Sequence, residues 1–255
     1  MIMSTIMSGL AVCLLAVFFG SHSYSGTQKT ADAGPRDLAD MRLENVRIKA
    51  QSIGQLFSSL SLSHNIPIGL EVALGDDETD TYDLDFREGT LSDLLAQFVA
   101  RHDQYTWEIR DGVVNVFPKD GYRDVVLGEL LGAEISDFTV KKETSCWALE
   151  DSLVTTPEIK RILTTHGITP RGRHFVGVYI PQVGREFTLN VSNLTLRSIL
   201  NKVVKESPVA KSWLVKRYDS DGKFLISVNA RHEGPPGGDG RPFIPQPNFP
   251  EVTEP

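Results

Sequence analysis

The residues with the clearest capacity for chemistry are six carboxylates in the segment DDETDTYDLD, residues 76–85. Clustered carboxylates can gather oxygen ligands around a calcium ion, and the candidates for such a site are Asp76, Asp77, Glu78 and Asp80. The segment lacks the spacing and the glycine of an EF-hand loop. A solvated hairpin loop whose charges protect a sheet edge explains the same residues, so we predict no metal site.

A cysteine nucleophile is the second candidate for chemistry. Cys146 could serve an envelope hydrolase if His166 or His174 lay close to it in space. However, it occupies the first apolar position of a predicted helix, where a free cysteine behaves as a small hydrophobe. His64 and His102 fall at predicted helix C-terminal ends, where a cation complements the helix dipole. No close metal-ligand spacing occurs among the six histidines, which are His22, His64, His102, His166, His174 and His232.

The remaining signatures of common enzyme classes are missing from the sequence. There is no Gly-x-Ser-x-Gly elbow, no Walker motif and no dinucleotide fingerprint. The formal net charge of −7 and the lack of a basic face argue against nucleic acid as a partner. We therefore predict a binding module that is not an enzyme, with no catalytic residue and no cofactor.

The N-terminal segment indicates export to the bacterial periplasm. Residues 1–25 carry no charge and contain a short apolar run, which is typical of a signal peptide but also fits an uncleaved anchor in the inner membrane. Residues 26–41 are small and polar and are expected to form a linker. Residues 231–255 are rich in proline and glycine and are predicted to be a disordered tail.

Between these ends, the sequence repeats itself. Residues 82–99 and 187–204 align without a gap, each with an alternating strand, a polar turn and a helical pattern. Thr90 and Thr195 precede the two helices, where a side-chain oxygen can accept a hydrogen bond from a free first-turn amide. The helices share one apolar face, whose central pairs are Leu94 with Leu95 and Ile199 with Leu200.

Each repeated helix leads into a strand that carries a tryptophan, Trp107 or Trp213, and then into an Asp-Gly turn. Asp-Gly between two apolar strands is a strong hairpin signal, and the four turn residues are Asp111, Gly112, Asp221 and Gly222. The two indoles are expected to fill the core between helix and sheet. The alternative is that they form exposed anchors for a partner.

A second strand–helix–strand pattern precedes each repeated block. In the first copy, Ser52 is the expected N-cap of the helix and residues 66–72 form the exit strand. In the second copy, the helix follows Ser145, a segment at 157–166 is inserted, and the exit strand is 174–180. The predicted fold is α+β, with two tandem β-α-β-β-α-β-β domains, at 42–118 and 135–230, each with two helices on small mixed sheets.

This pattern resembles the short N-terminal domain shared by secretins and TonB-dependent receptors. The resemblance lies in VRIKAQSIGQLFSSLSLSHNIPIGLEVAL and YDLDFREGTLSDLLAQFVARHDQYTWEIRDGVVNVFP, and it is weaker in the second copy, which has the insertion. It implies two helices between a two-stranded and a three-stranded sheet. It also implies a periplasmic docking module for a protein partner or, alternatively, a signalling module in receptor-coupled transcription control.

Overall fold

The computed structural model describes residues 38–76, 81–143, 146–170, 187–208, 210–218 and 223–230, all within one compact unit. These residues form an α+β fold, which confirms the predicted fold class. The predicted leader, the tail and most of the predicted linker lie outside the described residues. Within the described part of the chain, every helix is too short or too polar to cross a lipid bilayer.

The first half of the fold has the element order predicted for residues 42–118. Its strands and helices are β1 (Arg42–Ala50), α2 (Ile53–His64), β2 (Ile68–Glu71), β3 (Tyr82–Thr90), α3 (Leu91–Arg101), β4 (Tyr105–Arg110) and β5 (Val113–Pro118).

Among the described residues, the second half contains all but one of the predicted elements, together with two further helices. Its elements are α4 (Val125–Gly132), β6 (Glu134–Glu143), α5 (Cys146–Val154), α6 (Pro157–Thr165), β7 (Thr169–Pro170), β8 (Phe187–Thr195), α7 (Leu196–Glu206), β9 (Ala210–Tyr218) and β10 (Lys223–Ala230). Helix α6 lies in the inserted segment, and α4 precedes the predicted domain. The predicted exit strand at 174–180 lies outside the described residues, and β7 comes before it.

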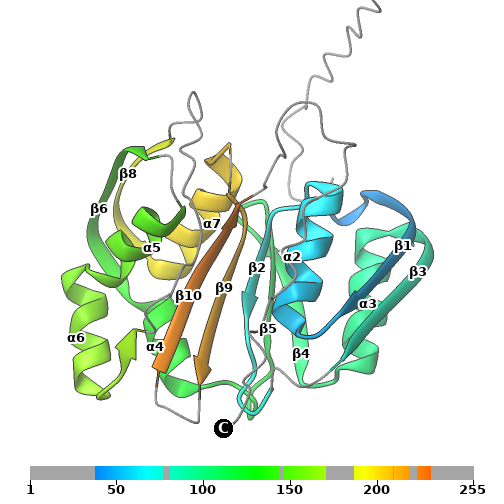
Figure 1. Ribbon diagram of the computed structural model, residues 1–255, viewed down its shortest axis with the longest axis horizontal. Coiled ribbons are helices and arrows are strands. Elements are labelled where there is room, and N and C mark those ends of the chain that lie inside the picture. Colours follow the sequence, from blue (N-terminus) through cyan, green and yellow to red (C-terminus); the bar gives the residue numbers. More distant parts are fainter. Residues whose placement is uncertain are drawn as a thin grey trace, which may run out of the picture. The chain divides into compact units, whose positions relative to one another are not determined.

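The strands form three sheets that follow one pairing scheme in both halves (Figure 1). Strand β1 pairs antiparallel with β3, as β6 does with β8. Strand β5 lies between parallel β2 and antiparallel β4, as β10 lies between parallel β7 and antiparallel β9. The two sets of three then join, because β2 pairs in parallel with β9, and the resulting six-stranded order is β4-β5-β2-β9-β10-β7. The shared scheme agrees with the predicted repeat, and the duplication itself stays a prediction.

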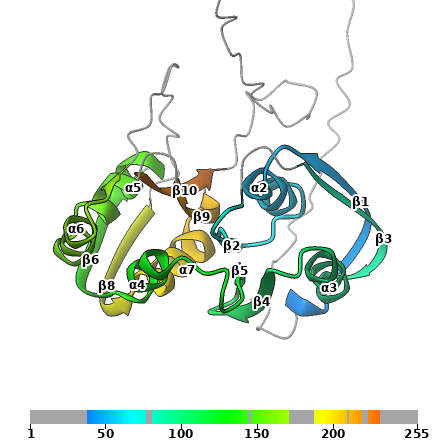
Figure 2. The same cartoon turned by 90° about the horizontal axis from the view of Figure 1, so that it is seen from below.

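The helices of the first half lie between its two sheets. Helices α2 and α3 separate the β1–β3 pair from the six-stranded sheet (Figure 2), and their apolar faces build the first core. Leu94 and Leu95 are fully buried there, and their predicted counterparts Ile199 and Leu200 are fully buried in the second core. The alternating apolar residues of the outer strands complete each core, since one face of a strand turns inward.

The helix N-termini are capped as the sequence predicts. The Ser52 side chain accepts a hydrogen bond from the backbone N–H of Gln55 at the start of α2. Thr90 and Asp93 form a reciprocal capping box on α3, and hydrogen bonds from Thr90 lower the pKa of the Asp93 carboxyl. Thr195 caps α7 by accepting from the backbone N–H of Ser198 at 3.2 Å. Such caps each contribute about 1 kcal/mol to stability.

Candidate binding site at a free sheet edge

Strand β4 forms one end of the six-stranded sheet, and no strand within the described residues pairs with its outer edge. It is joined to β5 by the predicted Asp-Gly turn, in which Asp111 and Gly112 both have positive φ, at 57° and 76°. Positive φ at both central residues is the type I′ geometry, which matches the twist of the two strands. The predicted second turn, Asp221-Gly222, lies outside the described residues.

The hairpin geometry determines which backbone groups of β4 point outward. Pairs in an antiparallel ladder alternate between hydrogen-bonded and non-hydrogen-bonded, and the pair that closes a two-residue turn is hydrogen-bonded. At the other end of the hairpin, the backbone N–H of Lys119 donates to the oxygen of Gln104 at 2.8 Å. This hydrogen-bonded pair fits the same alternation, counted from the turn. Trp107 and Ile109 are therefore in non-hydrogen-bonded pairs, and their N–H and C=O groups are directed away from β5. Consistently, Val114, which faces Ile109, donates its N–H to the other neighbour, at Pro67.

Strand β9 holds the matching place in the second half, but its outer edge is covered. Trp213 pairs with Val228 of β10, and Trp107 pairs with Val116 of β5. The two tryptophans correspond in phase, because each lies two residues before a residue, Val215 or Ile109, whose backbone groups point away from the hairpin partner. Strand β2 pairs in parallel with the outer edge of β9, from Ile68 opposite Ser212 to Glu71 opposite Val215. The backbone N–H of Val72 donates to the oxygen of Val215, the equivalent of Ile109, at 3.0 Å.

The side chains of β4 divide between the two faces of the sheet. Tyr105 is buried, and Trp107 and Ile109 are partly buried against the first core. On the other face, Arg110 forms an ion pair with Glu108 at 2.8 Å, and both side chains are substantially exposed. Among the described residues, the edge thus combines backbone groups that no strand pairs with and two apolar side chains that are partly buried.

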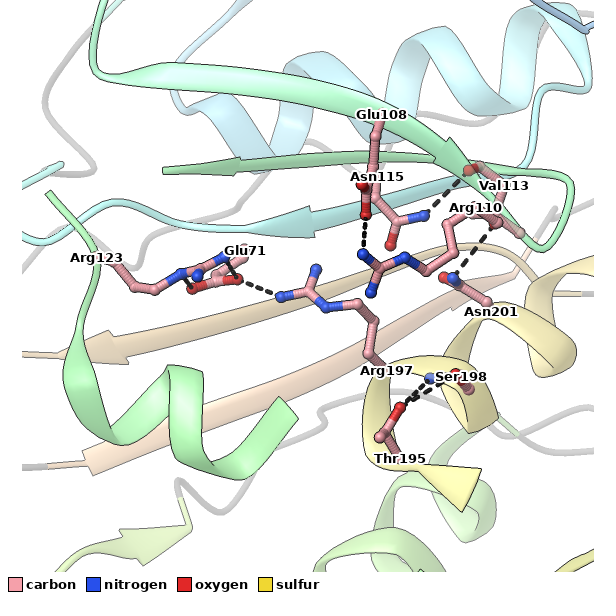
Figure 3. A network of polar contacts seen from close by, with 10 residues as sticks. All are labelled: Glu71, Glu108, Arg110, Val113, Asn115, Arg123, Thr195, Arg197, Ser198 and Asn201. Carbon is pink, nitrogen blue, oxygen red and sulfur yellow. Dashed lines mark hydrogen bonds and ion pairs between the residues drawn. The ribbon is translucent and has the colours of Figure 1, made fainter. Parts of the chain in front are cut away.

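The junction of β2 with β9 contains a buried ion cluster that the sequence does not reveal (Figure 3). The carboxylate of Glu71 is fully buried, and it accepts hydrogen bonds from Arg123 at 3.0 Å and from Arg197. The guanidinium groups of both arginines also lie over the ring of Phe117, at 5.5 and 5.8 Å from its centre. Because Glu71 lies in β2 of the first half and Arg197 in α7 of the second, the cluster links the two halves.

The two predicted tryptophans have different surroundings. Trp213 is 1% exposed, as predicted for a core residue, and its indole N–H donates to the Asn201 side chain at 2.9 Å. Gly69 of β2 lies directly opposite, and a β-carbon on Gly69 would be 2.2 Å from the Trp213 ring. Only a residue without a side chain fits there. Trp107 is partly buried, so its exposure is intermediate between that of the predicted core residue and that of the alternative, an exposed anchor.

The predicted acidic candidates do not form a described cluster. The carboxylate of Asp76 is buried and accepts hydrogen bonds from the hydroxyl groups of Tyr82 and Tyr105. Burial and the neighbouring carboxylate raise the pKa of the Tyr105 phenol, which therefore stays protonated as a donor. Asp77, Glu78 and Asp80 lie outside the described residues. Among those described, no group of three or more histidine, cysteine or acidic residues could hold a metal ion.

The other candidates for chemistry are placed only in part. Cys146 is the first residue of α5, as predicted, but its side chain and His174 lie outside what the structure describes. His64 ends α2 as predicted, although burial lowers its pKa, so the imidazole is neutral at pH 7 rather than a cation. His102 caps α3 and stacks on Phe98 at 4.6 Å. His166 contacts Glu129 at 2.8 Å.

Sequence reasoning missed the residues that join the two halves. A glutamate and a glycine within the apolar stretch IPIGLEVA, residues 66–73, are the only local signal, since a buried charge needs a partner and a strand glycine marks a close approach. Their partners, Arg197 and Trp213, lie far along the chain. No family model, curated protein or solved structure matches this chain.

Proposed function

We propose that this chain is a protein-binding module of the bacterial cell envelope that accepts an extended segment of its partner on the outer edge of β4. One observation carries the proposal: the equivalent edge, on β9, is already covered by a strand, β2. Strand addition gains main-chain hydrogen bonds for the backbone groups that an unpaired edge presents to solvent. The placement in the envelope is supported by the apolar leader and by the resemblance to secretin and TonB-dependent receptor domains.

The orientation of the β4 backbone supports a binding role over a catalytic one. Ile109 directs its N–H and C=O outward, as Val215 does toward β2. The partly buried side chains of Trp107 and Ile109 offer apolar area beside those groups. An edge of this kind recognises a strand and needs neither a nucleophile nor a metal ion.

The test compares two substitutions at one position. Ile109→Pro and Ile109→Ala both replace isoleucine by a smaller apolar residue, but only proline removes the outward N–H. Proline is tolerated where an edge N–H faces solvent. The tagged full chain is used to capture partners from envelope extract after crosslinking in intact cells. We expect to capture one defined protein with the wild type and with Ile109→Ala. Recovery with Ile109→Pro should be at least about fivefold lower than with Ile109→Ala, because one hydrogen bond is lost and its acceptor is left unsatisfied.

One control and two contrary outcomes make the comparison decisive. Circular dichroism melts establish that both variants are folded at the temperature of capture. Equal recovery with the proline and alanine variants would place the partner elsewhere on the molecule and contradict the proposal. So would the absence of any captured protein with the wild type.

A further inference from the structure

We infer that the β4 edge takes a strand that runs parallel to β4 and carries a glycine opposite Trp107. The inference rests on the proposed function, and it names the direction and the sequence of the bound segment. The inference comes from the pairing of β2 with β9, which shows how the corresponding edge of the β9–β10 hairpin is covered in the same molecule.

The direction follows from the register at β9. Ile68 lies opposite Ser212, and Glu71 lies opposite Val215, so β2 and β9 run the same way. In the equivalent positions on β4, a bound segment would begin beside Thr106 and would end beside Ile109. The outward N–H and C=O groups belong to corresponding residues of the two strands. On β4, Ile109 points outward, because Val114 opposite it bonds to Pro67 instead; on β9, Val215 points outward and accepts from the N–H of Val72. The same register therefore matches donors with acceptors.

The glycine follows from the space that the tryptophan takes. At β9, the indole of Trp213 extends over its neighbour, and three of its ring atoms lie 2.2 to 2.5 Å from where a β-carbon on Gly69 would be. Side chains of directly paired residues lie on the same face of a sheet, so any side chain at position 69 would meet the ring. Trp107 is the equivalent ring on β4 and is only partly buried. A segment with a glycine at this position would let the indole close over it and complete its burial.

The two edges differ on the opposite face, and this difference limits which flanking residues fit. Leu214 of β9 packs against the first core, where a β-carbon on Gly54 of α2 would be 2.5 Å from it. Its equivalent on β4 is Glu108, which forms an ion pair with Arg110 and is part exposed. We therefore expect the glycine and the apolar residues beside it to decide binding, while the residue facing Glu108 remains in contact with solvent.

Two synthetic peptides test the inference on the full chain. The first has the sequence of residues 66–73, IPIGLEVA, followed by two lysines for solubility, and in the second the glycine is replaced by valine. Binding is measured by fluorescence anisotropy of a dye on the peptide. We expect the glycine peptide to bind at least about tenfold more tightly, because the valine side chain would overpack against the indole. This order is the reverse of intrinsic strand propensity, which favours valine over glycine.

The direction is read by nuclear magnetic resonance with a nitroxide label on either end of the glycine peptide. A label on the N-terminus is expected to broaden the amide signal of Tyr105, and a label on the C-terminus that of Arg110. Ile109→Pro should weaken binding of the glycine peptide more than Ile109→Ala does, because only proline removes the outward N–H, and this difference places the peptide on β4 and not on β9.

Each other outcome overturns the inference. The reverse broadening pattern would show an antiparallel strand, and equal affinity of the two peptides would remove the role of the glycine. Self-association of the chain that Ile109→Pro abolishes would identify a second copy as the occupant. If neither peptide binds while capture of a partner still depends on the Ile109 N–H, the inference fails and the proposed function stands. If that dependence is also lost, both fail.

Discussion

The outer edges of β4 and β9 correspond in the two halves, but among the described residues only the edge of β9 is paired with another strand. Both strands begin a hairpin and carry a tryptophan two residues before a residue, Ile109 or Val215, that directs its backbone groups away from the hairpin partner. On β9 these groups meet β2, Trp213 is buried, and its indole N–H has an acceptor in Asn201. On β4 the corresponding tryptophan is only partly buried. The comparison indicates that burial of this tryptophan depends on the neighbouring strand.

The covered edge also shows what is needed to hold a strand in place. Strand β2 has a residue without a side chain where the indole lies and a buried carboxylate where two arginines converge. The first feature provides shape, and the second provides charge pairing that only a tertiary structure can supply. On β4, the shape is available in Trp107, whereas Arg123 and Arg197 are already engaged with Glu71. A strand bound at β4 would therefore be held mainly by backbone pairing and by the indole.

The largest effect is expected from removing the charge at the covered edge. Glu71→Ala would leave Arg197, whose side chain is 10% exposed, buried without its partner. Breaking a buried pair in this way costs about 3–5 kcal/mol of unfolding free energy. Urea denaturation of the variant and the wild type would measure this loss. The matched control is Glu206→Ala, which removes an exposed pair with Lys202 and should cost less than about 1 kcal/mol. Similar losses for both variants would mean that the junction contributes little to holding β2 on β9.

A smaller effect is expected from filling the space under the tryptophan. In Gly69→Ala the new β-carbon would overlap the Trp213 ring, and the indole or the strand must shift, at a cost of about 1–3 kcal/mol. The emission of the displaced indole should move to longer wavelength as it gains contact with water. Gly132→Ala in α4 is the matched control, because nothing lies within 4 Å of its added carbon, and alanine favours a helix over glycine by up to about 1 kcal/mol. A Gly69→Ala variant as stable as the wild type would argue that the glycine does not select the register, and would weaken the inference for β4.

The features that the sequence predicts correctly are local. The capping residues Ser52, Thr90 and Thr195, the Asp111-Gly112 turn and the paired apolar helix faces each depend on residues a few positions apart. Short-range spacing determines whether a hydrogen bond or a turn can form, so the sequence pattern is sufficient for these elements.

The features that the sequence does not predict depend on contacts between the two halves. Strand β2 was expected from its apolar run, but its pairing with β9 joins segments more than 140 positions apart. In the sequence, Glu71 is an isolated charge in an apolar stretch, because its partner Arg197 comes 126 positions later. Helix α4 went unpredicted because its eight residues VVLGELLG include two glycines, and its stability comes from packing on α7 and from its N-cap, Asp124. The free edge of β4 can be recognised only once the covered edge of β9 is known.

The smallest effect concerns the helix caps, where the two halves differ by one carboxylate. Asp93 completes the cap of α3, and its pKa is lowered from 3.8 by the hydrogen bonds from Thr90, whereas Ser198 holds the same place in α7. A carboxyl whose pKa is lower in the folded state stabilises the fold above its unfolded pKa, and this contribution is lost as the pH falls through the folded pKa. Asp93→Ser should therefore lower the unfolding free energy at pH 7, and the difference should shrink as the pH falls below the unfolded pKa of the carboxyl. Ser198→Asp should do the opposite, with a gain at pH 7 that fades in acid. Urea denaturation of both variants from pH 3 to pH 7 measures this exchange, and a Ser198→Asp difference that does not change with pH would show that the two caps are not equivalent.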